Sequence, residues 1–114
     1  MKPHFQVIET KPIPKGRPRM TRRGRVFTPP RTLESEEVIR QAYSGDRYEG
    51  PVTLICMFGK ETIQLGIIPL DPLEHTSKLR GDLDNYVKLL MDGLNGIAWS
   101  DDKQVMKIIA GKCD

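Results

Sequence analysis

Four aspartates near the C-terminal end of the sequence have the types and spacing that suit divalent-metal chemistry. Asp82 and Asp84 come at the start of a probable helix, and Asp101 and Asp102 follow soon after its end. Mg²⁺ and Mn²⁺ prefer oxygen ligands, typically a few carboxylates together with waters and phosphate oxygens. Crowded carboxylates repel one another, and a bound cation relieves that repulsion. The two pairs therefore predict a divalent-metal site within residues 82–105.

The segment between the two pairs is expected to be an amphipathic helix that positions them. Its apolar residues recur at helical spacing and form one stripe: Leu83, Val87, Leu90, Met91 and Leu94. Lys88 follows Asp84 by one turn on the polar arc, and Asn95-Gly96 is a typical helix end. Helical residues two apart point about 200° apart. Asp82 can therefore converge with Asp84 only if it is extended or at the N-cap, where the helix dipole favours anions.

Each aspartate also has an ordinary structural interpretation. Asp82 is a preferred N-cap residue, Asp84 and Lys88 could form a surface pair one turn apart, and Asp101-Asp102 could be a solvated turn. Taken together, the four residues favour the metal site over these separate interpretations. Trp99 is expected to pack beneath the second pair and fix its position.

The positive charge of the chain is concentrated near its N-terminal end. Residues 10–33 hold eight Lys and Arg and no acidic residue, whereas the whole chain carries a net charge of only +3. Proline and glycine interrupt residues 11–31 and predict an extended loop, with Val26-Phe27 as a short hairpin return. Arg17 and Arg19 are candidates for phosphate contacts. A solvated loop with no ligand is an equally good interpretation of the residues alone.

The predicted elements indicate an α+β domain of two layers, with a small mixed β-sheet and helices packed on one face. Val52–Phe58 is almost continuously apolar, which is typical of a central strand or of a strand at a dimer contact. Ile67–Leu70 is ambiguous between an edge strand and a buried loop, because Pro69 lacks a ladder donor. The expected elements are a strand at 5–10, helices at 32–43 and 83–94, and strands at 52–58 and 104–110.

Length and composition limit the function classes. A chain of 114 residues, 38% hydrophobic and 29% charged, is expected to form a single soluble domain spanning 1–114. No apolar run approaches a membrane span, and the first residues lead into no signal-peptide core. Cys56 and Cys113 have no metal-ligand spacing, and Cys56 is expected to be buried in its strand. A reducing, cytoplasmic setting fits both cysteines.

The motifs resemble those of RusA-type Holliday junction resolvases over roughly residues 5–110. The family pattern D-L-D-N-x-x-K is matched by Asp82 to Lys88, a following D-x-L by Asp92-Gly93-Leu94, and D-D-x-Q-V by Asp101 to Val105. The K-G-R-P-R common near the start of the family is matched by Lys15 to Arg19. The chain departs from the family at Gly81, where many members have proline.

The resemblance implies roles for named residues. Asp82, Asp84 and Asp102 match the catalytic metal-binding aspartates, Asp101 matches an acidic neighbour that assists as a ligand, and Lys88 matches a lysine needed for activity. The resemblance implies that the basic loop at 11–31 contacts DNA. The candidate DNA contacts in this loop are Lys15, Arg17, Arg19, Arg22 and Arg23, and Lys88 is a further candidate outside it.

The resemblance further implies a Mg²⁺- or Mn²⁺-dependent endodeoxyribonuclease of recombination and repair that needs no organic cofactor. Water activated by the cation would attack the phosphodiester in line. A four-way junction has approximate two-fold symmetry and needs two opposed cuts, so a homodimer with one acidic cluster per chain matches the substrate. The expected location is the cytoplasm of a bacterium, with the gene either bacterial or carried by a phage.

Two other function classes remain as alternatives. A non-catalytic, structure-selective DNA-binding module would bind junctions without cutting them. A metal-dependent nucleotide phosphohydrolase is less favoured, because the chain has no glycine-rich phosphate loop and free nucleotides do not require so basic a segment.

Overall fold

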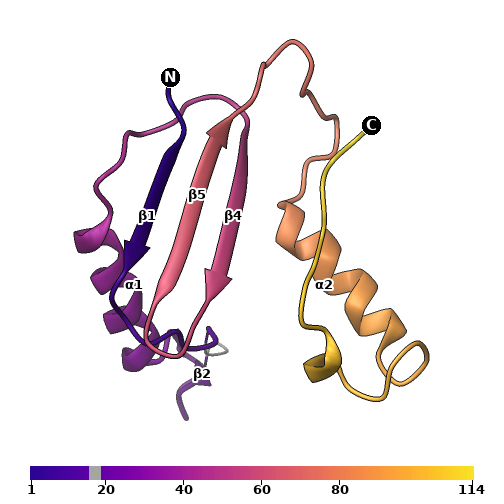
Figure 1. Cartoon of the computed structure of the whole chain (residues 1–114). Helices are drawn as coiled ribbons and strands as arrows, with labels where there is room; N and C mark the ends of the chain where they lie inside the picture. Colours follow the sequence, from indigo (N-terminus) through magenta and orange to yellow (C-terminus); the bar gives the residue numbers. More distant parts are fainter. Residues whose placement is uncertain (16–18) are drawn as a thin grey trace. The chain divides into compact units, whose positions relative to one another are not determined.

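The computed structural model describes residues 1–15 and 19–114, and the chain divides into two compact units, Met1–Asp71 and Pro72–Asp114 (Figure 1). Each unit is described by itself below. That the two units form one domain stays a prediction. Neither described helix has the length and apolar character that crossing a membrane requires.

The first unit is built on a three-stranded sheet with the strand order β1-β5-β4 (Figure 1). The strands are β1 (His4–Ile8), β4 (Val52–Phe58) and β5 (Ile63–Pro69). The predicted α+β class is confirmed. The predicted mixed sheet is wrong in its pairing, because both strand pairs are antiparallel. The four residues between β4 and β5 form a tight connection, in which the Gly59 amide donates to the Thr62 carbonyl at 2.9 Å, so the two strands are neighbours in an antiparallel hairpin.

The order of the strands corrects two expectations. The central strand is β5, which contains the ambiguous Ile67 to Pro69 stretch, and Pro69 is tolerated because it lies at the end of the strand opposite Val52. The apolar β4 lies at the edge, and all seven of its residues, including Cys56, are exposed. Hydropathy alone could not separate these strands, because both are rich in apolar residues.

The helix α1 spans Pro30–Ala42, so its start lies ahead of the predicted one. Thr32, a residue type that often caps helices, lies inside the first turn and is buried, and no acidic residue lies in that turn. Pro30 takes the first helical position, where its fixed φ is favourable and no amide donor is needed. Proline chemistry thus set the start of the helix, although Thr32 resembled a cap.

The C-terminal end of α1 is joined to β1 by side-chain contacts. The side-chain Nε2 of Gln6 donates to the Ala42 carbonyl at 2.6 Å. The side-chain Oε1 of Gln6 accepts from the Ser44 backbone amide at 3.1 Å. The rings of His4 and Tyr43 pack edge to face with centroids 5.2 Å apart. These contacts attach α1 to the sheet, while the arrangement of both helices on one face stays a prediction.

The second unit consists of helix α2 (Leu83–Leu94), the short 3₁₀ helix η1 (Asp102–Gln104) and a C-terminal segment that runs back along α2 (Figure 1). The predicted strand at 104–110 is wrong, because residues 105–110 have no strand structure. The end of this segment lies beside the residues before α2. There Asp114 accepts from the Ser77 hydroxyl and from the Lys78 amide, the latter at 2.7 Å.

Candidate active site

The predicted acidic residues and Lys88 all lie in the second unit, around α2. Asp82 is the N-cap of the helix in extended conformation, with φ −69° and ψ 143°, and Asp84 is in the first turn. The Asp82 carbonyl accepts from the amide of Asn85 at 3.1 Å, which starts the helix. The predicted local conformation of this pair, extended and then helical, is confirmed.

The Asp82 carboxylate is not used as a cap. It makes no side-chain capping hydrogen bond, although Asp is a residue that normally caps in this way. Both Asp82 and Asp84 are exposed to solvent. Anions are stabilised near this end of a helix, and the exposed Asp82 carboxylate is not committed to the helix amides.

The residue before the motif has a structural role that the sequence analysis missed. The Gly81 amide donates to the Tyr86 hydroxyl at 3.1 Å, and a Cβ at Gly81 would meet the Tyr86 ring at 3.1 Å. Proline at this position could not donate this bond, because it has no backbone N–H. Glycine therefore lets the Tyr86 ring pack on the backbone just ahead of Asp82.

Asp101 is used as a helix cap. Its Oδ1 accepts from the Lys103 amide at 2.9 Å, and the Gln104 side chain accepts in return from the Asp101 amide at 3.1 Å. This reciprocal arrangement is a capping box. Gln104 also accepts from the Ser100 amide at 2.6 Å. The side chains of the turn therefore hold it in place, which explains the 3₁₀ helix at the start of the segment where a strand was expected.

Asp102 is held by the only tryptophan of the chain. The Trp99 Nε1 donates to Asp102 Oδ1 at 2.7 Å, and both residues are half-buried. The prediction that Trp99 fixes the position of the acidic pair is confirmed for Asp102. One carboxylate oxygen of Asp102 is thereby oriented by a fixed donor, an arrangement that outer-shell partners commonly provide to metal ligands.

The chemistry of these residues fits a hard divalent cation, but their side chains are not gathered into a ready-made site. Within residues 1–15 and 19–114, no three His, Cys, Asp or Glu side chains are grouped closely enough to hold a metal ion. Mutual repulsion keeps carboxylates apart when no cation lies between them. The convergence of Asp82, Asp84 and Asp102 on one ion therefore stays a prediction.

Lys88 lies on α2 one turn after Asp84 and is exposed. On the same helix, Val87, Met91 and Leu94 of the predicted apolar stripe are half-buried, whereas Leu83 and Leu90 are exposed. Lys88 is therefore placed on the same helix as Asp84, and its role toward a phosphate stays a prediction.

The basic segment lies in the first unit and includes the predicted hairpin, formed by β2 (Arg19–Met20) and β3 (Val26–Phe27). The turn is closed by Thr21, whose amide donates to the Arg25 carbonyl at 2.8 Å, and by Gly24 at a φ of 80°. Arg22 and Arg23 are exposed in this turn, and Lys15 is exposed ahead of it. Arg17 falls outside the described residues, and Arg19 is placed only as a strand residue.

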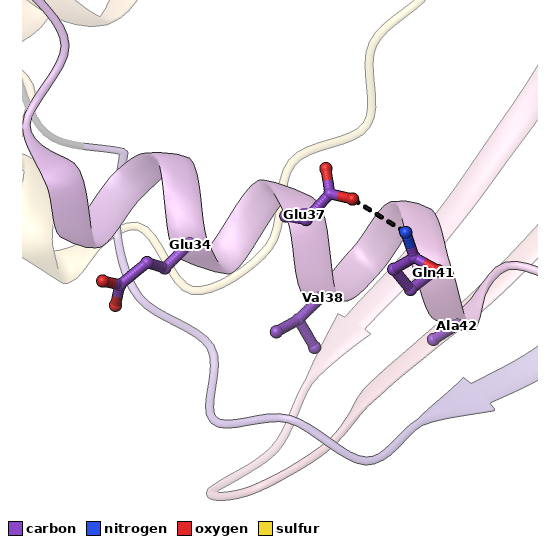
Figure 2. A pocket seen from close by; sticks show the side chains of 5 residues that line it. All are labelled: Glu34, Glu37, Val38, Gln41 and Ala42. Atoms are coloured by element: carbon purple, nitrogen blue, oxygen red, sulfur yellow. Dashed lines mark hydrogen bonds between the residues drawn. The ribbon is translucent and has the colours of Figure 1, made fainter.

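A shallow surface groove runs along α1 in the first unit. It is lined by Glu34, Glu37, Val38, Gln41 and Ala42, and Glu37 accepts from the Gln41 amide at 2.8 Å (Figure 2). This hydrogen bond, more than the neighbouring Arg40, lowers the pKa of Glu37. A groove with two carboxylates does not suit the phosphates of DNA, and none of the predicted site residues lines it.

A comparison with protein families identifies the group to which these motifs belong. Residues 9–114 match the sequence profile of the endodeoxyribonuclease RusA family. The chain belongs to the RusA family. Membership implies an endodeoxyribonuclease that resolves Holliday junctions, and hence a hydrolase with junction DNA as its substrate. Searches of curated proteins and of solved structures found no significant match. The RusA match covers both the basic segment and the acidic motifs.

Proposed function

We propose that this RusA-family chain is a Mg²⁺- or Mn²⁺-dependent nuclease that resolves four-way junctions by paired hydrolysis, working as a homodimer in the cytoplasm of a bacterial host. The single observation that carries the proposal is the state of Asp82. It is an N-cap aspartate whose carboxylate leaves the helix amides uncapped and is exposed beside that of Asp84. A capping carboxylate would have favoured the purely structural interpretation.

Three aspartates are assigned to the cation. Asp82 and Asp84 offer exposed carboxylates from the start of α2. Asp102 offers the oxygen that Trp99 does not occupy. When bound, a divalent cation supplies positive charge against the phosphate oxygens and lowers the pKa of the attacking water. Asp101 is assigned to the turn, because its carboxylate caps η1.

The remaining steps belong to the basic side chains. Lys88 neutralises and orients the scissile phosphate from the helix that carries Asp84. Lys15, Arg22 and Arg23 are exposed cations that bind the DNA backbone without reading its sequence, a role that Arg17 and Arg19 share. No protein group acts as a covalent nucleophile.

A homodimer follows from the substrate. Each chain supplies one acidic motif region, and a junction needs cuts on two opposed strands. Sedimentation of the protein with an unlabelled four-way junction is expected to give two chains per junction. One chain per junction at concentrations that support cleavage would contradict the dimer.

The direct test uses labelled four-way, Y-shaped and linear duplex DNA, each incubated with protein in Mg²⁺, in Mn²⁺ and in a chelator. Paired nicks in the four-way substrate are expected only with metal, and linear duplex should stay intact. Junction binding without cleavage in either metal would identify a non-catalytic DNA-binding module. Hydrolysis of free nucleotides with no binding to branched DNA would indicate a phosphohydrolase instead.

A further inference from the structure

Tyr86 makes hydrogen bonds to the backbone at both ends of the Gly81-Asp82 pair. Its hydroxyl accepts from the Gly81 amide at 3.1 Å, and its backbone amide donates to the Asp82 carbonyl at 3.4 Å. All of these groups belong to the second unit, Pro72–Asp114. Between the two bonded backbone atoms lie only the φ and ψ torsions of Gly81 and Asp82, which are the soft torsions of a backbone. One tyrosine therefore restrains the torsions that set the direction of the Asp82 side chain.

This restraint matters because the usual one is missing at Asp82. An N-cap aspartate is normally oriented by a hydrogen bond from a helix amide to its carboxylate. Asp82 makes no such bond, and its backbone is extended at φ −69° and ψ 143°. The placement of its carboxylate therefore depends on the backbone. The Tyr86 hydroxyl fixes that backbone one residue ahead of the N-cap, at the Gly81 amide.

The lack of a side chain at Gly81 lets the tyrosine approach. A Cβ at this position would lie 3.1 Å from the Cε2, Cζ and hydroxyl oxygen of Tyr86, which is closer than an ordinary van der Waals contact. Among the described glycines, those with positive φ are Gly24 and Gly96, so Gly81 is not required for a left-handed backbone. Gly81 therefore serves the contact with the Tyr86 ring.

We propose that Tyr86 is a positioning residue of the nuclease. Through the Gly81 amide, it holds Asp82 in the extended conformation from which the carboxylate binds the divalent cation. This role rests on the proposed metal-dependent function and adds a residue that acts through the backbone, not as a ligand. Functional groups are precise when neighbouring residues fix their conformation. Without the hydroxyl, the cation would have to order Asp82 on binding, which lowers its affinity.

Tyr86→Phe tests the contact, because it keeps the ring and removes the acceptor of the Gly81 amide. Hydrogen exchange of that amide in the metal-free protein, followed by NMR, is expected to become faster. Affinity for Mn²⁺ alone, measured from the electron paramagnetic resonance signal of the free ion, is expected to fall about tenfold, the lower end of the range for outer-shell partners. Junction cleavage should fall at limiting Mn²⁺ and recover at saturating Mn²⁺.

The matched control is Tyr48→Phe. It removes a hydroxyl that donates to the Lys2 carbonyl at 2.5 Å in the first unit. Both substitutions delete one tyrosine hydroxyl and its hydrogen bond, but only Tyr86→Phe affects the backbone ahead of Asp82. Tyr48→Phe should therefore leave the Mn²⁺ affinity unchanged.

Gly81→Ala tests the same contact without changing the tyrosine. Its Cβ displaces the Tyr86 ring, and the loss of Mn²⁺ affinity should resemble that of Tyr86→Phe. In a Tyr86→Ala background no ring is displaced, so Gly81→Ala should cause no further loss. Gly50→Ala is the control for the substitution itself, because a Cβ there meets nothing within 4 Å. Far-UV circular dichroism checks that every variant is folded.

The outcomes separate the positioning role from the function. Unchanged Mn²⁺ affinity in Tyr86→Phe, with lower thermal stability alone, overturns the positioning role and leaves the nuclease proposal standing. Equal losses from Gly81→Ala with and without the tyrosine ring overturn it in the same way. A wild-type protein that binds no Mn²⁺ and cuts no junction overturns both proposals. A wild-type protein that binds Mn²⁺ more tightly than Tyr86→Phe but cuts no DNA supports the positioning role and contradicts the nuclease.

Discussion

The two aspartate pairs on either side of α2 were predicted to do the same work, yet their surroundings differ. At the start of the helix, the Asp82 carboxylate makes no cap and is exposed together with that of Asp84. After the helix, the Asp101 carboxylate caps η1, and the Asp102 carboxylate accepts from the Trp99 indole. The Asp82 carboxylate is thus not used by the helix, whereas each carboxylate of the second pair has one oxygen bound to a protein donor.

The difference shows that the spacing of acidic residues identifies candidate ligands but not which of them is free to bind. Hydrogen-bond donors near each carboxylate decide that. A donor can occupy the carboxylate, as the Lys103 amide does for Asp101, or orient it, as the Trp99 indole does for Asp102. The experiments below separate these cases, beginning with the largest expected effect.

Replacement of Asp82 or Asp84 by Asn is expected to reduce junction cleavage at least about a hundredfold. The physical reason is that a lost ligand removes about 3 kcal/mol or more of charge stabilisation, and about 1.4 kcal/mol corresponds to tenfold in rate. Single-turnover cleavage of a labelled four-way junction measures the rate, and a gel-shift assay in a chelator should show unchanged binding.

The matched control for these variants is Asp46→Asn, which makes the same change at an exposed residue of the first unit. It should cut at the wild-type rate. If Asp82→Asn and Asp84→Asn also cut at that rate in Mg²⁺, neither residue is a ligand and the open pair has no catalytic role.

Trp99→Phe is expected to reduce cleavage by about 10- to 100-fold, the usual range for the loss of an outer-shell partner of a ligand. The ring is kept, but the donor to Asp102 at 2.7 Å is lost. Titration with Mn²⁺ should show a weaker apparent metal affinity, with activity partly recovered at high Mn²⁺. A purely structural role for Trp99 would lower thermal stability and leave the metal dependence unchanged.

Asp101 is tested by two substitutions whose outcomes differ. Asn caps a helix as well as Asp does, so Asp101→Asn should retain both stability and near-normal cleavage. Ala cannot cap, so Asp101→Ala should lower the free energy of unfolding by about 1 kcal/mol. Urea denaturation and the cleavage assay measure the two effects. A large loss of cleavage in Asp101→Asn would make Asp101 a ligand after all.

The smallest expected effect is on stability and concerns Asp114, a third carboxylate that accepts hydrogen bonds from protein donors. Hydrogen bonds from the Ser77 hydroxyl and then the Lys78 amide lower the pKa of Asp114 below its usual value. Because the pKa is lowered in the folded state, this contact contributes its full stabilisation of the fold above the usual carboxyl pKa of about 4. That stabilisation is lost as the pH falls through the lowered pKa of Asp114. The amide resonance of Lys78 should report this loss in an NMR titration. In Asp114→Asn, the same resonance should not titrate in that range.

Local patterns predicted the α2 region well. The apolar stripe, the extended N-cap at Asp82 and the helix end at Asn95 with Gly96 at a φ of 80° were all inferred from spacing and residue type. These features depend on neighbours within a turn or two of chain. The same holds for the Val26-Phe27 hairpin return and for Trp99, which is only three residues from Asp102.

Predictions that depended on distant partners were less successful. The apolar run at 52–58 was expected to be a central strand or a strand at a dimer contact, and the order β1-β5-β4 excludes the central position. The run at 104–110 was expected to be a strand, but the capping box at Asp101 and Gln104 formed a 3₁₀ helix at its start. A strand needs a neighbouring strand to form hydrogen bonds with its backbone groups, and the local sequence pattern does not specify which strand that is.

The residues alone revealed the family motifs and the helix that carries Asp84, and they predicted the metal chemistry, because ligand preference and helical periodicity are local properties. Only the tertiary structure decided which strand lay at the edge of the sheet and that the Asp114 carboxylate accepts from Ser77 and Lys78. These depend on which donors and surfaces the folded chain brings together. The physical reason is that hydrogen bonds and sheet pairing are satisfied between partners, and a single position in the sequence does not specify its partner.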